Sequence, residues 1–88
     1  MPNDESMLAV RVQFFSQLKD IVEAPELAIE LYPNATVADL LRHLYRLHPE
    51  LEKWDRQILV GVGVEFVERD HLLSPNDEVA IMPPVQGG

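Results

Sequence analysis

Residues 36–49, TVADLLRHLYRLHP, carry the longest helical pattern in the chain. The apolar residues recur at the three- and four-residue spacing of a single helix face, and they are Val37, Leu40, Leu41, Leu44 and Leu47. Thr36 is placed to cap the first turn, Asp39 stands where a capping box has its carboxylate, and Pro49 should end the helix. A helix of about 12 residues cannot bury this apolar face alone, so the rest of the chain must provide a surface for it.

Segments with a period of two lie on both sides of this helix and are predicted to form that surface. Residues 8–14, LAVRVQF, alternate apolar and polar side chains, and residues 26–31, ELAIEL, repeat the pattern. Residues 16–25 between them are interpreted as a long hairpin connection. After the helix, residues 56–69 contain apolar β-branched runs interrupted by two glycines, and residues 77–82, DEVAIM, form a last short strand that the following prolines stop.

This order of elements predicts an α+β fold in which one main helix covers a mixed sheet of about four to five strands. If the first and last strands are central neighbours, they run parallel, and the C-terminal segment leaves from one end of the sheet. We therefore expect three parts: a disordered N-terminal tail at residues 1–6, a folded domain at residues 7–82 and a flexible C-terminal tail at residues 83–88.

The composition restricts what the chain can do. None of its 88 residues is cysteine, which excludes disulfides, thiolate metal sites and a cysteine nucleophile. Fifteen acidic and seven basic side chains give a net charge of -8, so nucleic acid should be repelled and a partner with a basic surface favoured. No stretch approaches the ~20 apolar residues of a membrane span, and we expect a cytoplasmic protein without membrane partners.

The C-terminal segment PPVQGG predicts a function in which the end of the chain itself reacts. Its residues are Pro83, Pro84, Val85, Gln86, Gly87 and Gly88. The two prolines lack N–H donors and fix φ, so the backbone should leave the sheet in an extended form, and the two glycines remove every Cβ from the last positions. Such a tail fits a narrow channel in another protein's active site. A carboxylate is a poor electrophile, and it must be activated by ATP before it can accept sulfur or an amine.

Three stretches together carry a family resemblance: LAVRVQFF, TVADLLRHL and LLSPNDEVAIMPPVQGG. Over residues 8–88 the chain resembles the small subunits of molybdopterin synthase, a family of sulfur carriers with the ubiquitin-like β-grasp fold. The most specific part is PPVQGG following DEVAIM, because thiamin-pathway carriers and protein-conjugating relatives usually lack the paired prolines. The resemblance therefore implies a β-grasp domain with a free Gly-Gly tail.

The chain departs from the family pattern at two places. Asn76 stands where the family commonly has glycine before Asp-Glu-Val, and asparagine is the next residue most tolerant of a left-handed conformation. The triplet Gly61, Val62 and Gly63 replaces a frequent Ala-Val-Asn. The second change removes an asparagine side chain and one local hydrogen bond that it could make.

The resemblance also implies a reaction cycle with three partners. An E1-like adenylating enzyme uses ATP to activate the Gly88 carboxylate, and a sulfurtransferase replaces the adenylate with sulfur to give a C-terminal thiocarboxylate. The large synthase subunit, in a heterotetramer, then holds Gly87 and Gly88 beside a cyclic pterin precursor. No cofactor is expected to stay bound, and the general acids and bases are expected to belong to the large subunit, so this chain is not catalytic alone.

A partner-binding surface is predicted near the tail. Phe15 and Met82 point away from the core face on the period-two count, and Phe66 is a third candidate, with Lys19 and Arg11 as charged neighbours. The tail residues 83–86 would extend this contact. The alternative is that loops of the same chain cover these apolar side chains.

Other readings of the sequence stay open. His43, His48 and His71 lie on different faces or in a turn, so no metal site is expected. Five carboxylates could form a catalytic pair, although solvated turns and sheet edges explain them better: Glu65, Glu68, Asp70, Asp77 and Glu78. Alternative functions are a sulfur carrier of another pathway, a protein modifier that joins its carboxylate to lysines, and an interaction module whose Gly-Gly is incidental.

Overall fold

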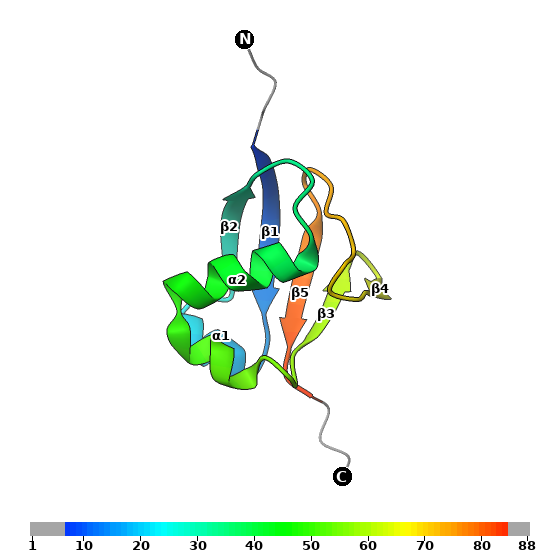
Figure 1. The fold of residues 1–88 in the computed structure, drawn as a ribbon. Coiled ribbons are helices and arrows are strands. Elements are labelled where there is room, and N and C mark those ends of the chain that lie inside the picture. Colours follow the sequence, from blue (N-terminus) through cyan, green and yellow to red (C-terminus); the bar gives the residue numbers. More distant parts are fainter. Residues whose placement is uncertain (1–6, 85–88) are drawn as a thin grey trace.

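A five-stranded mixed sheet, two α-helices and a 3-10 helix are formed by residues 7–84, the part of the chain that the computed structural model describes (Figure 1). The elements in chain order are β1 (Leu8–Phe14), α1 (Gln17–Val22), β2 (Glu26–Leu31), α2 (Val37–Leu47), η1 (Pro49–Trp54), β3 (Leu59–Val62), β4 (Glu65–Phe66) and β5 (Glu78–Met82).

The strand order β2-β1-β5-β3-β4 places the first and last strands side by side at the centre of the sheet. β1 and β5 are parallel, with Val12 opposite Val79, and the remaining neighbours are antiparallel. The predicted parallel pairing is therefore confirmed, and so is the α+β class with one main helix over a mixed sheet. This arrangement is the β-grasp fold, and it makes β5 end at the same end of the sheet as β1.

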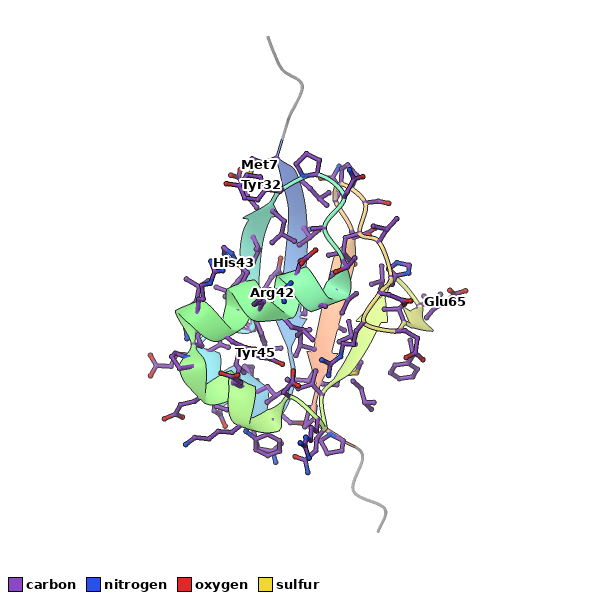
Figure 2. All side chains as sticks on the ribbon, viewed as in Figure 1. Met7, Tyr32, Arg42, His43, Tyr45 and Glu65 are labelled. Carbon is purple, nitrogen blue, oxygen red and sulfur yellow. The ribbon has the colours of Figure 1, made fainter. Side chains whose placement is uncertain are left out.

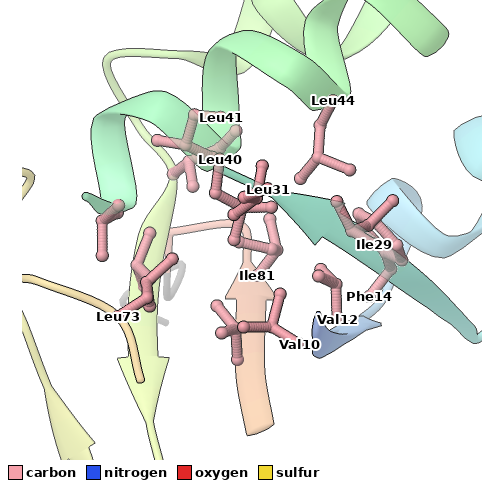
Figure 3. Packing of buried hydrophobic residues seen from close by; sticks show 14 of the residues in the cluster. Val10, Val12, Phe14, Ile29, Leu31, Leu40, Leu41, Leu44, Leu73 and Ile81 are labelled. Atoms are coloured by element: carbon pink, nitrogen blue, oxygen red, sulfur yellow. The ribbon is translucent and has the colours of Figure 1, made fainter. Parts of the chain in front are cut away.

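The core lies between α2 and one face of the sheet (Figures 1 and 3). The helix contributes buried residues at its helical spacing, and the two central strands contribute alternate residues; they include Val37, Leu40, Leu41, Leu44, Val10, Val12, Val79 and Ile81. Burying one such Leu or Ile side chain stabilises the fold by about 1.5–3 kcal/mol. The apolar face seen in the sequence and the period-two strands thus cover each other.

The start of α2 is fixed by the predicted capping box. The Asp39 N–H donates to Thr36 Oγ1 at 3.2 Å, and the Thr36 N–H donates to Asp39 Oδ2 at 2.9 Å. This backbone hydrogen bond lowers the pKa of Asp39, and the hydrogen bond from Arg42, at 2.6 Å, acts in the same direction. At the other end the helix stops at Leu47, directly before the His48–Pro49 pair, as Pro49 predicted.

The interpretation of residues 16–25 as a plain hairpin connection is wrong. Helix α1 lies within this segment and buries Leu18 and Val22, which are four residues apart and so share one helix face. The left-handed Glu23, with φ of 64°, ends the helix. Helix η1 was also not predicted, and it buries Leu51 beneath the end of α2. Both elements are too short for periodicity to reveal, and contact with the core decides them.

The turn before β5 has the conformation expected from Asn76, whose φ is 69°. Its N–H donates to the carbonyl of Ala9 at 2.7 Å, while the Ser74 N–H donates to Asp77 Oδ2 at 2.8 Å. Gly63 is also left-handed, with φ of 63°, in the turn between β3 and β4. Because asparagine and glycine are the two residues that tolerate this conformation best, each departure from the family pattern preserves its turn.

Replacing Asn76 tests this turn. We expect Asn76→Gly to leave the free energy of unfolding unchanged or slightly raised, because glycine adopts positive φ without a Cβ clash. Asn76→Val should lower it by about 1 kcal/mol or more, because a β-branched residue is strained there. Thermal unfolding of both variants makes the comparison, and equal stability of the two would contradict a turn that depends on the left-handed conformation.

A network of polar side chains connects the helices to the loop that follows β4. The Tyr45 hydroxyl donates to Asp55 Oδ1 at 2.5 Å, and Arg69 donates to the same oxygen at 3.1 Å and to the Asp55 carbonyl at 2.5 Å. The hydrogen bond from Tyr45 lowers the pKa of Asp55, while burial raises the pKa of Tyr45. The network joins α2, the end of η1 and the loop that follows β4.

This network makes stability depend on pH. Because the pKa of Asp55 is lower in the folded state, its contribution is complete well above the unfolded value of about 3.9 and is lost as the pH falls through the folded value. We expect Tyr45→Phe to lower the free energy of unfolding by about 1 kcal/mol at pH 7 and by less in acid. Urea unfolding from pH 7 to 3 measures this, with exposed Tyr32→Phe as the control; a constant difference would contradict it.

Candidate functional site

The sheet face opposite α2 carries exposed apolar side chains near the end of β5. In the register of the sheet, Leu59 lies opposite Met82, and Gly61 lies opposite both Ala80 and Phe66, so these residues share one face. Phe15 follows β1, and its N–H donates to the carbonyl of Ile81 at 3.2 Å. We call the four large side chains the open-face patch: Phe15, Leu59, Phe66 and Met82.

The members of the patch differ in exposure. Phe66 is 71% exposed, Phe15 43% and Leu59 39%, whereas Met82 is half-buried. A Cβ added at Gly61 would lie only 3.6 Å from Met82 Cε, so the methionine side chain extends across the bare glycine backbone. The prediction that loops leave Phe15 and Phe66 uncovered is therefore confirmed, and Met82 is partly covered by the neighbouring strand instead of standing free.

Sequence reasoning missed Leu59 and the role of Gly61. Both lie in the run ILVGV, where consecutive apolar residues hide which side chains face outward. The pairing of β3 with β5 makes the distinction, because it places Val60 beside Ile81 in the core and Leu59 beside Met82 on the other face.

The two predicted charged neighbours of the patch, Lys19 and Arg11, differ in whether they are already paired within residues 7–84. Lys19 is exposed on α1, where its N–H donates to the carbonyl of Ser16, one residue beyond Phe15. Arg11 lies on β1, and its guanidinium is 2.7 Å from the carboxylate of Glu26 on the neighbouring strand β2. Arg11 is thus already paired within the chain, so Lys19 is the better candidate for a contact with a partner.

The tail begins directly at this site. Pro83 and Pro84 are half-buried and directly follow Met82, which ends β5 and belongs to the open-face patch. Val85, Gln86, Gly87 and Gly88, which the sequence singled out, lie outside the described residues. The fold therefore delivers the chain to residue 84 at the end of the sheet that carries Phe15, Leu59 and Met82.

Residues 7–84 contain the histidines and carboxylates that the sequence analysis considered as metal ligands or catalytic groups. Within them no group of three or more His, Cys, Asp or Glu side chains is arranged to hold a metal ion. Of the five carboxylates considered as catalytic, Asp77 accepts the hydrogen bond of the Ser74 N–H, which assigns it to the turn. None of the helices in this range is both long and apolar enough to span a membrane.

Comparison with known proteins gives a consistent result. A family model, described as the ThiS family, matches residues 12–88. A curated relative from Escherichia coli, a molybdopterin synthase sulfur carrier subunit, is 35% identical over 86 residues, which covers 90% of this chain and 99% of the relative.

Two solved structures are also similar. A Pyrococcus furiosus protein, provisionally identified as subunit 1 of molybdopterin converting factor, matches with a TM-score of 0.82 and 26% identity over 89% of this chain and 99% of that chain. The small archaeal modifier protein 1 of Methanosarcina acetivorans matches with a TM-score of 0.78 and 27% identity over 94% and 99%.

Proposed function

The chain belongs to the ThiS family, and from that membership we propose that it is a sulfur carrier that serves as the small subunit of molybdopterin synthase. In this function Gly88 bears a C-terminal thiocarboxylate and donates its sulfur to a cyclic pterin precursor during molybdenum cofactor biosynthesis. The observation that carries the proposal is that the family match extends through the final Gly87–Gly88 pair. The 35% identity to a molybdopterin synthase sulfur carrier subunit supports this pathway over other sulfur pathways.

The chemistry requires activation by another enzyme. A Gly88 carboxylate oxygen attacks the α-phosphorus of ATP on an E1-like adenylating enzyme, which forms a mixed anhydride and releases pyrophosphate. Sulfide-level sulfur (HS⁻) supplied by a sulfurtransferase then attacks the acyl carbon, the bond from this carbon to the AMP oxygen breaks, and AMP leaves as the thiocarboxylate forms. Neither step calls for a side chain of this protein, and a chain without cysteine is compatible with that.

We further propose that the open-face patch docks on the large subunit in a heterotetramer. Phe66 and Phe15 provide large apolar contacts, and a single aromatic anchor can account for 2 kcal/mol or more, roughly thirtyfold in affinity. The net charge of -8 favours a basic surface on that partner and speeds the encounter. Docking through this face places residues 83–84 next to the partner, so the following residues can enter its active site.

A second candidate function is protein modification, in which the activated Gly88 carboxylate is joined to lysine amines. The likeness to a small archaeal modifier protein favours keeping it, since that structure covers 94% of this chain. Intact-mass analysis after incubation with an adenylating enzyme, ATP and a sulfur donor separates the two. Exchange of one oxygen for sulfur supports the carrier, whereas lysine-linked conjugates support the modifier.

Substituting Phe66 tests the docking surface. We expect Phe66→Arg to weaken binding to the large subunit at least about tenfold, because it removes an aromatic anchor and places a cation against a basic surface. Leu72→Arg is the matched control, since Leu72 is 59% exposed but is bridged to Thr36 at the start of α2, away from the patch. Isothermal titration calorimetry measures both, and circular dichroism checks the fold. Equal affinity of the two variants would show that the surface is misassigned.

Changing the length of the tail tests the reactive group. Deleting Gly88 or adding one residue after it shifts the carboxylate by about 3.5 Å. We expect sulfur transfer to the pterin precursor to fall at least about a hundredfold, because a misplacement of about 1 Å can already cost that much. Stability should stay within about 0.5 kcal/mol, and Gly87→Ala should show an intermediate loss.

An extra residue before Met1 is the matched control for this experiment, because it lengthens the chain equally without touching the tail. Turnover of thiocarboxylated protein with the large subunit is the measurement. If the deletion and the C-terminal extension both keep the wild-type rate, Gly88 is not the reactive residue and the carrier function fails.

A further inference from the structure

A groove of about 510 Å³ lies between β2 and α2, at the end of the sheet where β1 begins. Figure 2 shows Tyr32 just beyond the end of β2 and Arg42 on α2, and both residues line the groove. Its carboxylates, Glu30 and Asp39, balance Arg42 and Arg46, and Arg42 is already paired with Asp39 at 2.6 Å. Charge therefore selects no class of ligand for this groove, whereas a strained turn at the other end of β1 bears on the open-face patch.

The turn from β1 into α1 contains a strained residue, Ser16. Its φ is 54° and its ψ is -134°, and across it the Leu18 N–H donates to the carbonyl of Phe15 at 3.1 Å. These are the features of a type II′ turn with Ser16 at the first central position, which glycine normally occupies because a Cβ disfavours this conformation. Ser16 therefore adopts a backbone conformation that its own side chain opposes.

Main-chain contacts on both sides hold Ser16 in this conformation. Its side chain is exposed and forms no capping hydrogen bond, so it does not fix the turn by itself. The Phe15 N–H donates to the carbonyl of Ile81 at 3.2 Å, which ties the turn to β5, and the Lys19 N–H donates to the carbonyl of Ser16 at 3.0 Å. The buried Leu18 anchors the following helix in the core. The sheet and the core thus impose the strained conformation.

Phe15 depends on this turn for its place in the open-face patch. Its N–H is bound to Ile81 and its carbonyl to Leu18, so both of its main-chain groups are fixed while its side chain stays 43% exposed. If Ser16 turned to negative φ, the chain could not fold back at this point, and either the Phe15–Leu18 hydrogen bond would break or Leu18 would leave the core. Either change would release the Phe15 backbone on one side.

We propose that Ser16 is a positioning residue of the docking surface and acts through Phe15. The positive φ of Ser16 holds Phe15 in one orientation before the partner arrives, so little of the binding free energy is lost in ordering this aromatic side chain. The inference rests on the function proposed above, because it takes the open-face patch as the surface that docks on the large subunit.

Substitutions at Ser16 separate its backbone conformation from its hydroxyl group. Ser16→Gly should keep the affinity for the large subunit and raise the melting temperature by a few degrees, because glycine adopts this turn without strain. Ser16→Val should weaken binding about two- to tenfold, the cost of ordering one side chain, because a β-branched residue destabilises the turn. Ser16→Ala keeps the Cβ without the hydroxyl and should bind like the wild type. Isothermal titration calorimetry measures each affinity.

Two measurements exclude a general loss of stability as the cause. Asn76→Val places a β-branched residue in the left-handed turn before β5, at the opposite end of that strand from Met82, and should lower the melting temperature without changing the affinity. Exchange of the Leu18 amide hydrogen should be at least about tenfold faster in Ser16→Val than in Asn76→Val, because only the first variant disturbs the hydrogen bond to Phe15. If Ser16→Val does not fold, Ser16→Thr, which is β-branched but keeps the hydroxyl, replaces it.

A double-mutant cycle with Phe15→Ala tests whether the effect of Ser16 passes through Phe15. We expect Phe15→Ala to weaken binding and Ser16→Val to add no further loss in that background. An equal loss from Ser16→Val in both backgrounds would overturn the proposal, and so would the same loss in Asn76→Val. A loss in Ser16→Ala as large as in Ser16→Val would also overturn it, because the hydroxyl would then be a direct contact.

The result for Phe15→Ala separates this proposal from the docking function. A loss of affinity in Phe15→Ala with none in Ser16→Val overturns the positioning role alone. No loss in Phe15→Ala removes Phe15 from the docking surface and overturns the positioning role with it. These affinities are measured without sulfur on Gly88, so failure of the sulfur transfer itself would not alter them.

Discussion

The parallel pairing of β1 with β5 is the interaction on which the rest of this structure depends. Two parallel neighbours cannot be joined by a tight turn, so the chain between Phe14 and Glu78 must cross from one end of the sheet to the other. Helix α2 lies in that crossing and covers the inner face with its apolar side (Figure 1). The same pairing brings the end of β5 beside Phe15, so one hydrogen-bonded ladder both closes the core and positions residues 83–84 at an apolar surface.

The two faces of the sheet serve different purposes. The inner face packs against α2, and its buried side chains form one core cluster with those of the helices. The outer face has no large side chain at Gly61 or Ala80. The Met82 side chain approaches Gly61, and exposed Phe66 lies opposite this glycine on the neighbouring strand. In the function proposed above, an acidic protein whose apolar patch lies beside its reactive end needs no cleft of its own, because the partner would complete the active site.

Local signals in the sequence predicted those features that depend on local physics. The capping box of Thr36 and Asp39, the end of α2 before Pro49 and the left-handed Asn76 each follow from the chemistry of a few adjacent residues. Helix α1 was not predicted, because a helix of six residues with only two of them buried shows no measurable periodicity. For the candidate site, Phe15 and Met82 could be found from alternation, whereas Leu59 could not, since its neighbours are apolar on both sides.

The sequence by itself determined the fold class and the acidic character, and it is the source of the chemistry proposed for the tail, because periodicity, charge and the Pro-Pro and Gly-Gly pairs are properties of short stretches. Only the tertiary structure decided which apolar residues face outward and what surrounds them. Leu59 joins Met82 through the β3–β5 register, and Glu30 from β2 and Arg46 from α2 line the same groove. These contacts join residues far apart along the chain, and their relative positions are set by strand register and helix packing rather than by any local preference.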